Sequence, residues 1–497
     1  MQKHLQPSSS TGHMKKKLLP LLVVALFQAG HANASIDLIA SGSLLGSSSG
    51  SYADLSGLTG LMENGVAGNY LGGIGSALAW AGGNTFIATP DRGPNATVYN
   101  SLVDDTSSYI SRFQTVTLDL TANTSGSGLA YNLTPTLTAT TLLSSPTPLN
   151  YGSGAGLGNQ IDGVTPLGSG APAINTASAN YFTGRSDNFA PGASTNPNNA
   201  RLDPEGARVS NDGKSVFVSD EYGPYVYQFD RATGQRIQSF ALPANLAISN
   251  LSPQGAVEIA GNTTGRVTNK GMEGLAITPD GKTLVGIMQA PLEQDTKKIV
   301  RIVTIDIATG VTHEYAYPLT TGSGVSEIVA FNDHQFGVGE RDGKGLGDGS
   351  TAAVKQLFRI DLTGAQDVSG MSGDLSSMAV GKTLVLDMVS VLGSHGILGN
   401  QVPAKIEGIA FGQDVMVDGV LKHTIYVAND NDFVPGVAGP NNFYVFAASD
   451  AELGATYMAQ SITPAVPEPE TYALMLFGLG LLGFVARQKK LNLTAAF

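Results

Sequence analysis

Short apolar stretches recur in pairs through the middle of the chain, with a turn sequence between the two members of each pair. Four pairs begin with a glutamate beside glycine or an apolar residue and end in polar or acidic residues, at 203–221, 272–289, 326–342 and 406–430. A fifth pair at 77–92 keeps both apolar stretches but lacks the leading glutamate. Short apolar runs bounded by turn residues are typical of β-strands. The pattern therefore predicts a repeated unit of paired strands.

The turns between the paired strands support this interpretation. Asn211-Asp212-Gly213 and Pro279-Asp280-Gly281 supply the left-handed backbone positions that a hairpin needs. A further apolar stretch that closes on aspartate follows three of the pairs, at 226–230, 302–306 and 357–361. Repeated units of three or four strands are typical of propeller blades. We therefore expect an all-β fold, a β-propeller of about six blades, with the sixth in the Gly/Ser/Thr-rich stretch 120–200 or built from the two chain ends.

Composition agrees with this fold and narrows the chemistry. The chain of 497 residues contains 62 glycines, and only 14% of its residues are charged, which fits short strands and tight turns better than helices. It has no cysteine, which excludes a disulfide framework, a thiol nucleophile and a cysteine-based metal site. The histidines of the body lack zinc-ligand spacing and fall outside the acidic repeats. Neither a histidine-rich zinc enzyme nor a Ser-His-Asp hydrolase is expected.

The first 34 residues have the pattern of a targeting segment. Met14 opens a stretch with three lysines, an apolar run from Leu18 to Phe27 and the small-x-small sequence Ala32-Asn33-Ala34, which is the order of a secretory signal peptide. The apolar run is too short for a permanent anchor. We expect upstream residues and a signal peptide at 1–34, cleavage near Ser35 and an exported protein.

The other end carries a second targeting pattern. The sequence Val-Pro-Glu-Pro at 466–469 precedes an apolar, glycine-containing stretch at 471–486 and a basic end at 487–490. This order resembles the PEP-CTERM sorting signal of Gram-negative bacteria. The resemblance implies a sorting segment at 464–490 that lies transiently in the inner membrane. A sorting protease, an exosortase, would remove it and release the protein to the cell surface or extracellular matrix. A plain C-terminal anchor is the alternative.

The body between these two segments is strongly acidic. The end segments hold seven of the 28 basic residues and two of the 40 acidic ones, which leaves the body with a net charge near −17, against −12 for the whole chain. Such a charge disfavours nucleic acid and anionic membrane as partners and favours bound cations.

The repeat brings acidic residues to the propeller axis, because equivalent positions of successive blades converge there. The leading glutamates form one expected ring, Glu205, Glu273, Glu327 and Glu407. The ends of the second strands form another, Asp91, Asp220, Glu221, Glu340, Asp342, Asp430 and Asp432. Carboxylates in a partly buried channel repel one another unless some are protonated or cations bind. Ca²⁺ is the cation that favours such oxygen ligands in an exported protein.

Roles follow from this arrangement. Metal binding is assigned to Asp91, Glu205, Glu273, Glu327, Glu340, Asp342, Glu407, Asp430 and Asp432. Arg92 and Arg341 would hold phosphate oxygens, and Glu221, next to Asp220, would act as general base. The leading glutamates have a structural alternative, in which their carboxylates accept hydrogen bonds from backbone N–H groups of the next blade.

Taken together, the motifs resemble the phytase-like family ("esterase-like activity of phytase") of exported propeller proteins, over roughly residues 70–445. They are Asp-Pro-Glu-Gly-Ala at 203–207, Val-Ser-Asp-Glu-Tyr-Gly-Pro-Tyr at 218–225, Gly-Met-Glu-Gly-Leu-Ala-Ile-Thr-Pro-Asp-Gly-Lys at 271–282, Gly-Glu-Arg-Asp at 339–342, Ile-Glu-Gly-Ile-Ala-Phe at 406–411 and Asn-Asp-Asn-Asp at 429–432. The resemblance implies a phytase-like propeller domain at 35–460 and phosphoester hydrolysis. The sequence departs from the acidic pattern at two places. The first unit lacks the leading glutamate, and the second strand of the 272–289 unit ends in Met288-Gln289 where other units carry acidic residues.

The first hypothesis is therefore an exported, Ca²⁺-dependent phosphoester hydrolase, phytase-like or phosphodiesterase-like, that acts on a small phosphorylated substrate. One alternative is a non-catalytic, calcium-stabilised propeller that binds exopolysaccharide in the extracellular matrix. Another is a propeller esterase or lactonase with a single axial metal. The number of cations separates the three, because clustered ions favour phosphate, one axial ion favours lactones and peripheral ions favour binding alone.

Overall fold

The structure is a computed structural model that describes residues 36–463, apart from 104, 153–157, 160, 161, 166, 168, 169, 188–194 and 297. The described residues all belong to one compact unit. The expected signal peptide and sorting segment lie outside the described residues. None of the described helices is long and apolar enough to cross a membrane.

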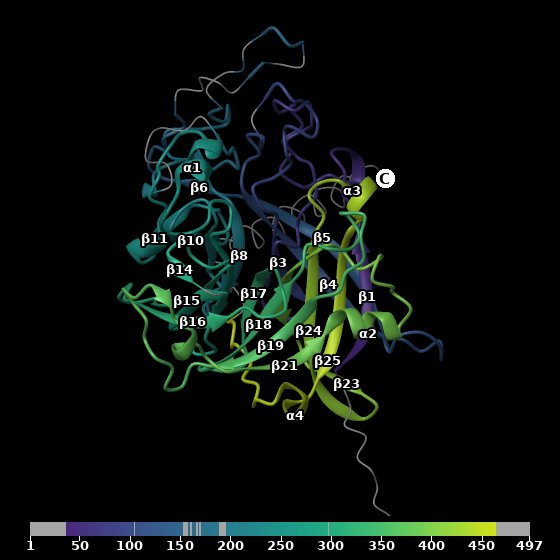
Figure 1. The fold of residues 1–497 in the computed structure, drawn as a ribbon. Coiled ribbons are helices and arrows are strands. Elements are labelled where there is room, and N and C mark those ends of the chain that lie inside the picture. Colours follow the sequence, from purple (N-terminus) through teal and green to yellow (C-terminus); the bar gives the residue numbers. More distant parts are fainter. Residues whose placement is uncertain are drawn as a thin grey trace, which may run out of the picture. The chain divides into compact units, whose positions relative to one another are not determined.

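Five antiparallel sheets form the blades of a β-propeller (Figure 1). From the innermost strand outward they are blade 1, β2 (Ala77–Trp80), β3 (Thr85–Thr89), β4 (Arg112–Ala122) and β5 (Tyr131–Leu142); blade 2, β8 (Pro204–Val209), β9 (Ser215–Asp220), β10 (Tyr225–Asp230) and β11 (Arg236–Ala241); blade 3, β12 (Met272–Ile277), β13 (Thr283–Met288), β15 (Ile299–Asp306) and β16 (Thr312–Pro318); blade 4, β17 (Gly324–Ala330), β18 (Gln335–Arg341), β19 (Lys355–Asp361) and β21 (Lys382–Asp387); and blade 5, β22 (Lys405–Phe411), β24 (Val420–Asp430), β25 (Asn441–Ala448) and β1 (Asp37–Leu44). Each innermost strand packs against the innermost strands of both neighbouring blades, so the ring is closed.

The propeller is confirmed, and it has five blades in place of about six. The five repeated units of the sequence are the five blades. The stretch 120–200 forms no blade of its own, since its described part supplies the end of β4, strand β5 and the small β6 (Ser144–Ser145) and β7 (Asn180–Tyr181) pair. The two ends of the body complete blade 5, where β1 pairs with β25 from Asp37 opposite Ala447 to Leu44 opposite Asn441. Figure 1 shows this pair as a purple strand beside a yellow one.

The remaining elements are short and lie outside the blade sheets or at their edges. The helices are α1 (Gly255–Gly261), α2 (Met388–Ser394), α3 (Pro435–Ala438) and α4 (Asp450–Leu453), with 3₁₀ turns at Gly50–Tyr52, Ala244–Leu246 and Ser376–Met378. The additional strands are β14 (Asp295–Thr296), β20 (Gly373–Asp374) and β23 (Val415–Val417).

Turn residues and apolar faces explain why the blades form. The β8–β9 hairpin turns at Gly213 and the β12–β13 hairpin at Gly281, with φ of +71° and +73°, a region that glycine occupies without strain. Apolar side chains fill the spaces between blades. Phe217 of blade 2, for example, belongs to one buried cluster with Leu275 of blade 3 and Ile328 of blade 4. Burial of such a side chain contributes about 1.5–3 kcal/mol.

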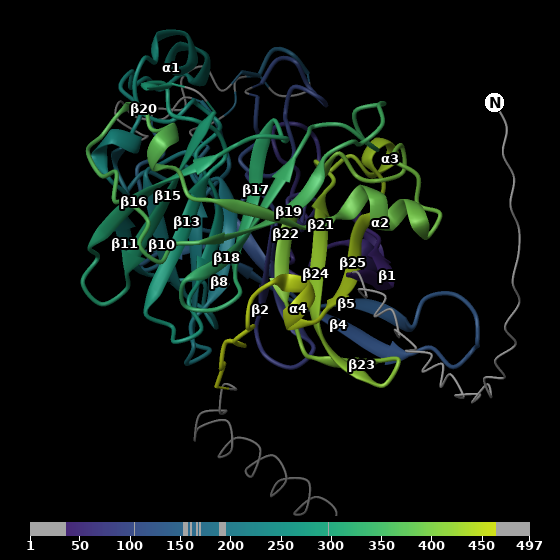
Figure 2. The ribbon, with the colours of Figure 1, turned by 60° about the horizontal axis from the view of Figure 1, so that its bottom comes forward.

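The chain crosses one end of the propeller axis after α4, in a segment that we call the C-terminal strap (residues 455–463). The Tyr457 ring stacks on Phe411 of blade 5 at a centroid distance of 4.3 Å. Met458 N donates to Phe331 O at 2.8 Å, and Gln460 Nε2 donates to Val209 O at 2.7 Å. Figure 2 shows the strap in yellow, running from α4 toward β2. The strap therefore covers the axis at the end where the innermost strands finish, and it joins blades 2, 4 and 5.

Candidate functional site

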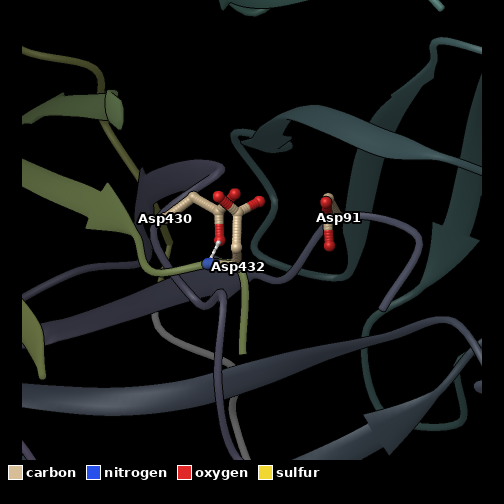
Figure 3. A group of neighbouring side chains, drawn as sticks. All are labelled: Asp91, Asp430 and Asp432. Carbon is tan, nitrogen blue, oxygen red and sulfur yellow. Dashed lines mark hydrogen bonds between the residues drawn. The ribbon is translucent and has the colours of Figure 1, made fainter. Parts of the chain in front are cut away.

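Acidic side chains gather at the opposite end of the axis, where the innermost strands begin and the second strands finish. Carboxylate oxygens of Asp91, Asp430 and Asp432 lie within 4.8 Å of one another, and so do those of Asp91, Asp203 and Glu205. Asp91 therefore belongs to both groups. Figure 3 shows Asp430, the last residue of β24, beside Asp432 on the loop that follows, with Asp91 opposite them on the loop after β3.

Further glutamates extend these two groups. The negative charges of Glu273, Glu221 and Glu407 all act on Glu205. We call the whole set the acid cluster, which consists of Asp91, Asp203, Glu205, Glu221, Glu273, Glu407, Asp430 and Asp432.

Three basic side chains enter the acid cluster. Arg341 Nη2 lies 2.6 Å from Glu407 Oε1 and 3.5 Å from Glu273 Oε1. Lys405 Nζ lies 2.8 Å from Asp430 Oδ2 and also contacts Asp432. Arg92 Nη1 lies 3.0 Å from Asp203 Oδ2 and 3.9 Å from Glu221 Oε2. The carboxylates outnumber these bases, so the cluster keeps an excess of negative charge.

Two carboxylates of the cluster have oxygen atoms without a partner among the described residues. Glu205 is 7% exposed, and its carboxylate makes no hydrogen bond or ion pair with any described residue. Glu221 is 2% exposed, and within the described part of the chain its Oε1 has no hydrogen-bond partner. An ionised carboxylate that is buried without a partner is strongly disfavoured. Both groups therefore have oxygen atoms available to a ligand.

The pKa values of several carboxyl groups of the cluster are raised because its buried negative charges are only partly offset by the neighbouring bases. Burial raises the pKa of Asp91 to about 7, and the Asp203 and Asp432 carboxylates add to the rise while Arg92 and Lys405 oppose it. Burial, with the charge of Glu407, raises the pKa of Glu273 to about 8. Burial also holds the pKa values of Glu205, Glu221 and Asp430 well above the usual range. Without a cation, these buried carboxyl groups therefore keep their protons to a higher pH than exposed ones do.

Each of three leading glutamates lies at a β-bulge, which turns its side chain toward the cluster. The strand register shifts at Glu205, Glu273 and Glu407, in the innermost strands of blades 2, 3 and 5. The glycine after each glutamate lies against the next innermost strand, where a Cβ would come within 2.7 to 2.9 Å of a backbone nitrogen. The recurring Glu-Gly pair therefore combines a redirected carboxylate with close packing of neighbouring strands.

Glu327 lies elsewhere because the bulge of blade 4 is one residue earlier, at Ser326. Glu327 is paired with Gly339 of β18 in the way that Gly274 of blade 3 is paired with Ile287 of β13. Its Oε1 accepts hydrogen bonds from Leu275 N at 3.0 Å and Ile328 N at 2.9 Å. Its Oε2 lies 3.2 Å from Arg208 Nη2. This arrangement is the structural alternative described for the leading glutamates.

Two more residues assigned to metal binding point away from the acid cluster. Glu340 accepts hydrogen bonds from Tyr317 Oη at 2.7 Å and from Thr321 N at 3.0 Å, and it pairs with Lys382. Asp342 holds the start of β19, because its Oδ1 lies 2.7 Å from Lys355 Nζ. Both carboxylates are satisfied outside the acid cluster, Glu340 by residues of blades 3 and 4 and the connection between them, and Asp342 by Lys355 of blade 4.

The two carboxylates predicted to be catalytic have different surroundings. Asp220 Oδ1 accepts hydrogen bonds from Asp203 N at 3.1 Å and Tyr222 N at 3.0 Å, so Asp220 holds the backbone around the site. Burial raises its pKa to about 7. Glu221, by contrast, presents an oxygen without a partner, next to Arg92.

Sequence reasoning missed several residues of the site. Asp203 belongs to the recognised Asp-Pro-Glu-Gly motif, and its position two residues before Glu205 was the available signal. Lys405 stands two residues before Glu407 in the same way. Nothing in the pattern distinguished Arg208 or Asn269. Asn269 Oδ1 accepts a hydrogen bond from Arg92 Nη1 at 2.9 Å.

The donor set fits a hard divalent cation. The ligand atoms are carboxylate oxygens gathered within 4.8 Å, two of the carboxylates have oxygens without partners, and there is excess negative charge. Calcium prefers oxygen ligands in flexible numbers and geometries. The residues suited to hold it are Asp91, Asp203, Glu205, Asp430 and Asp432.

Comparison with known proteins places this chain in a family. The family model described as "Phytase-like: Esterase-like activity of phytase" matches residues 69–433, which is more than half of the chain, and the chain belongs to this family. The PEP-CTERM protein-sorting motif matches residues 465–490. This motif marks an exported protein that exosortase processes in Gram-negative bacteria.

Individual relatives resemble parts of the chain. It is 37% identical over 142 residues to an uncharacterized secreted protein of Arthroderma benhamiae, an alignment that covers 24% of this chain and 27% of the relative. Two solved structures are similar to it. Kuenenia stuttgartiensis hydrazine synthase is 15% identical with a TM-score of 0.25, over 52% of this chain and 71% of that chain. The β-propeller domain of Myceliophteria thermophila Cps50 (Swd1) is 10% identical with a TM-score of 0.21, over 46% and 52%.

Proposed function

We propose that this protein is an exported, calcium-dependent phosphoester hydrolase. The observation that carries the proposal is the pair of three-carboxylate groups joined at Asp91, beside an arginine with free donor atoms. Family membership supports the esterase class. Calcium held by the acid cluster would supply positive charge that offsets the negative charge of the phosphoryl oxygens.

Arg92 has a position suited to a phosphate group. Its Nη1 donates to Asp203 and Asn269, whereas its Nε and Nη2 donate to no described residue. The Arg92 side chain is 19% exposed. A guanidinium held along one edge presents its other edge to phosphate oxygens in a fixed orientation.

Glu221 is the group that we assign as general base. In the proposed hydrolysis, the oxygen of a water molecule forms a bond to phosphorus while Glu221 accepts its proton. The ester P–O bond breaks, and the leaving alcohol oxygen takes a proton from solvent. Asp220 is a positioning residue, because its hydrogen bonds hold the backbone on both sides of Glu221.

The test is hydrolysis by the purified full-length chain, with calcium or with chelator. Release of nitrophenol follows the cleavage of a nitrophenyl phosphodiester, and release of phosphate follows the cleavage of phytate and a sugar monophosphate. We expect calcium-dependent release and a roughly 10²–10⁴-fold loss of kcat in Glu221→Gln. Glu293→Gln, which changes an exposed glutamate outside the acid cluster, is the matched control. Release that is unaffected by chelator, or full activity of Glu221→Gln, would contradict the proposal.

A further inference from the structure

A polar cavity of about 240 Å³ lies directly behind Arg92. Its lining includes Arg92, the Arg92 partner Asn269, and Tyr222, the residue after Glu221. Residues of α1 and the neighbouring loops line it as well. A phosphate group placed between Arg92 and the acid cluster would therefore have this cavity beside it.

The charges around the cavity limit what it accepts. Two carboxylates, those of Asp187 and Asp105, line it. Arg201 also lines it, but Arg201 Nη1 lies 3.4 Å from Glu258 Oε2 and its guanidinium carbon lies 4.0 Å from the centre of the Tyr222 ring. Arg201 is therefore paired with Glu258, although its Nε has no hydrogen-bond partner among the described residues. A second phosphate inside the cavity would face two carboxylates, while the one further described base that lines it is already paired.

Hydroxyl groups, by contrast, would find partners. Thr268 Oγ1 lines the cavity and, among the described residues, has no hydrogen-bond partner. The Asn95 amide and the Ser186 hydroxyl line it as well. Buried polar atoms without partners favour a ligand that supplies hydrogen bonds. The volume is below that of most ligand pockets and suits a group as small as a glycerol or a monosaccharide.

We propose that this cavity binds the alcohol part of the substrate and that the substrate carries a single phosphate on an uncharged polyhydroxyl group. This inference rests on the proposed function and gives it a substrate class. It disfavours polyphosphorylated inositols, because every phosphate beyond the first would lie against Asp187 and Asp105 or outside the cavity.

The experiment compares fructose 1-phosphate, fructose 1,6-bisphosphate and phytate as substrates of the full-length chain in calcium. The two fructose phosphates share a leaving sugar and differ in one phosphate. We expect kcat/KM to be about tenfold higher for the monophosphate, since each added charge is repelled at short range. The double variant Asp105→Asn with Asp187→Asn should reduce that ratio toward one. The Asp187→Asn change keeps a side-chain oxygen for the hydrogen bond that Asp187 Oδ1 accepts from Gly255 N.

Two results would overturn the inference while leaving the hydrolase intact. One is equal or faster turnover of the bisphosphate or phytate, and the other is an unchanged ratio in the double variant. If neither these three esters nor the nitrophenyl phosphodiester is hydrolysed in calcium, the proposed hydrolase fails instead. Calorimetric binding of glycerol 3-phosphate and fructose 1,6-bisphosphate then tests the cavity on its own. The inference requires that the monophosphate bind more tightly than the bisphosphate. It also requires that the difference between their affinities be smaller in the double variant. Glu293→Gln serves as the control throughout.

Discussion

Arg208 and Glu327 form an ion pair on the propeller axis, with Nη2 of the arginine 3.2 Å from Oε2 of the glutamate. The same guanidinium donates to Leu78 O of blade 1 and Ile328 O of blade 4, each at 2.8 Å. Both side chains are buried. The pair therefore ties the innermost strands together between the acid cluster and the C-terminal strap.

Removal of one partner should destabilise the fold. Glu327→Ala leaves the buried Arg208 charge without its carboxylate, and we expect the free energy of unfolding to fall by about 3–5 kcal/mol. Urea denaturation of the variant and of Glu293→Gln measures the difference, with a change within about 0.5 kcal/mol for the control. The double variant Arg208→Met with Glu327→Leu should recover much of the loss. A loss below about 1 kcal/mol for Glu327→Ala would show that the pair does not hold the ring.

Asp91 should decide cation binding, because it belongs to both carboxylate groups. Calcium at 100 times its dissociation constant stabilises a folded protein by about 2.7 kcal/mol. We expect Asp91→Asn to lose most of the rise in Tm that calcium produces, and Asp342→Asn to keep it, since Asp342 pairs with Lys355 outside the cluster. Differential scanning calorimetry with and without calcium measures both. An equal rise in Asp91→Asn and the unaltered chain would place the cation elsewhere.

The raised pKa values of the acid cluster predict how stability depends on pH. Asp91, at about 7, and Glu273, at about 8, hold protons in the folded state at pH values where the unfolded chain has released them. The stability of the calcium-free protein should therefore fall as the pH rises from about 4 to 8. Calcium binds the deprotonated carboxylates, so the rise in Tm that it causes should grow over the same range. Thermal unfolding in chelator and in calcium, repeated across this range, measures both trends. A calcium-free protein that becomes more stable toward pH 8 would be incompatible with these shifts.

The blades could be predicted because their signals are local. Gly213 and Gly281 mark hairpins that the structure contains, and each leading motif falls at the start of an innermost strand. The contribution of the chain ends was less visible. The pairing of Asp37 with Ala447 joins segments at opposite ends of the body, and no short motif in the sequence indicates this pairing.

The acid cluster was predicted in outline, and the differences arise from register. The pattern aligned Glu327 with Glu273, because each stands in a similar apolar setting. The bulge at Ser326 moves Glu327 by one residue and turns it to the other side of the strand. Glu340 follows the repeat as well, but Tyr317 of blade 3 and Lys382 of the outermost strand of blade 4 contact it. A bulge and a contact with a distant strand are both decided by packing, which a linear pattern does not contain.

The pairing of β1 with β25 has a consequence for how the protein folds. About 400 residues separate the two strands along the chain, and closure of so long a loop before its contacts form makes folding slow. Until β1 is in place, β25 is an exposed sheet edge, which invites pairing with another chain. In an exported protein that leaves the membrane N-terminus first, β1 stays unpaired until β25, the last of the described strands, has followed it. The chain is open to aggregation throughout that delay.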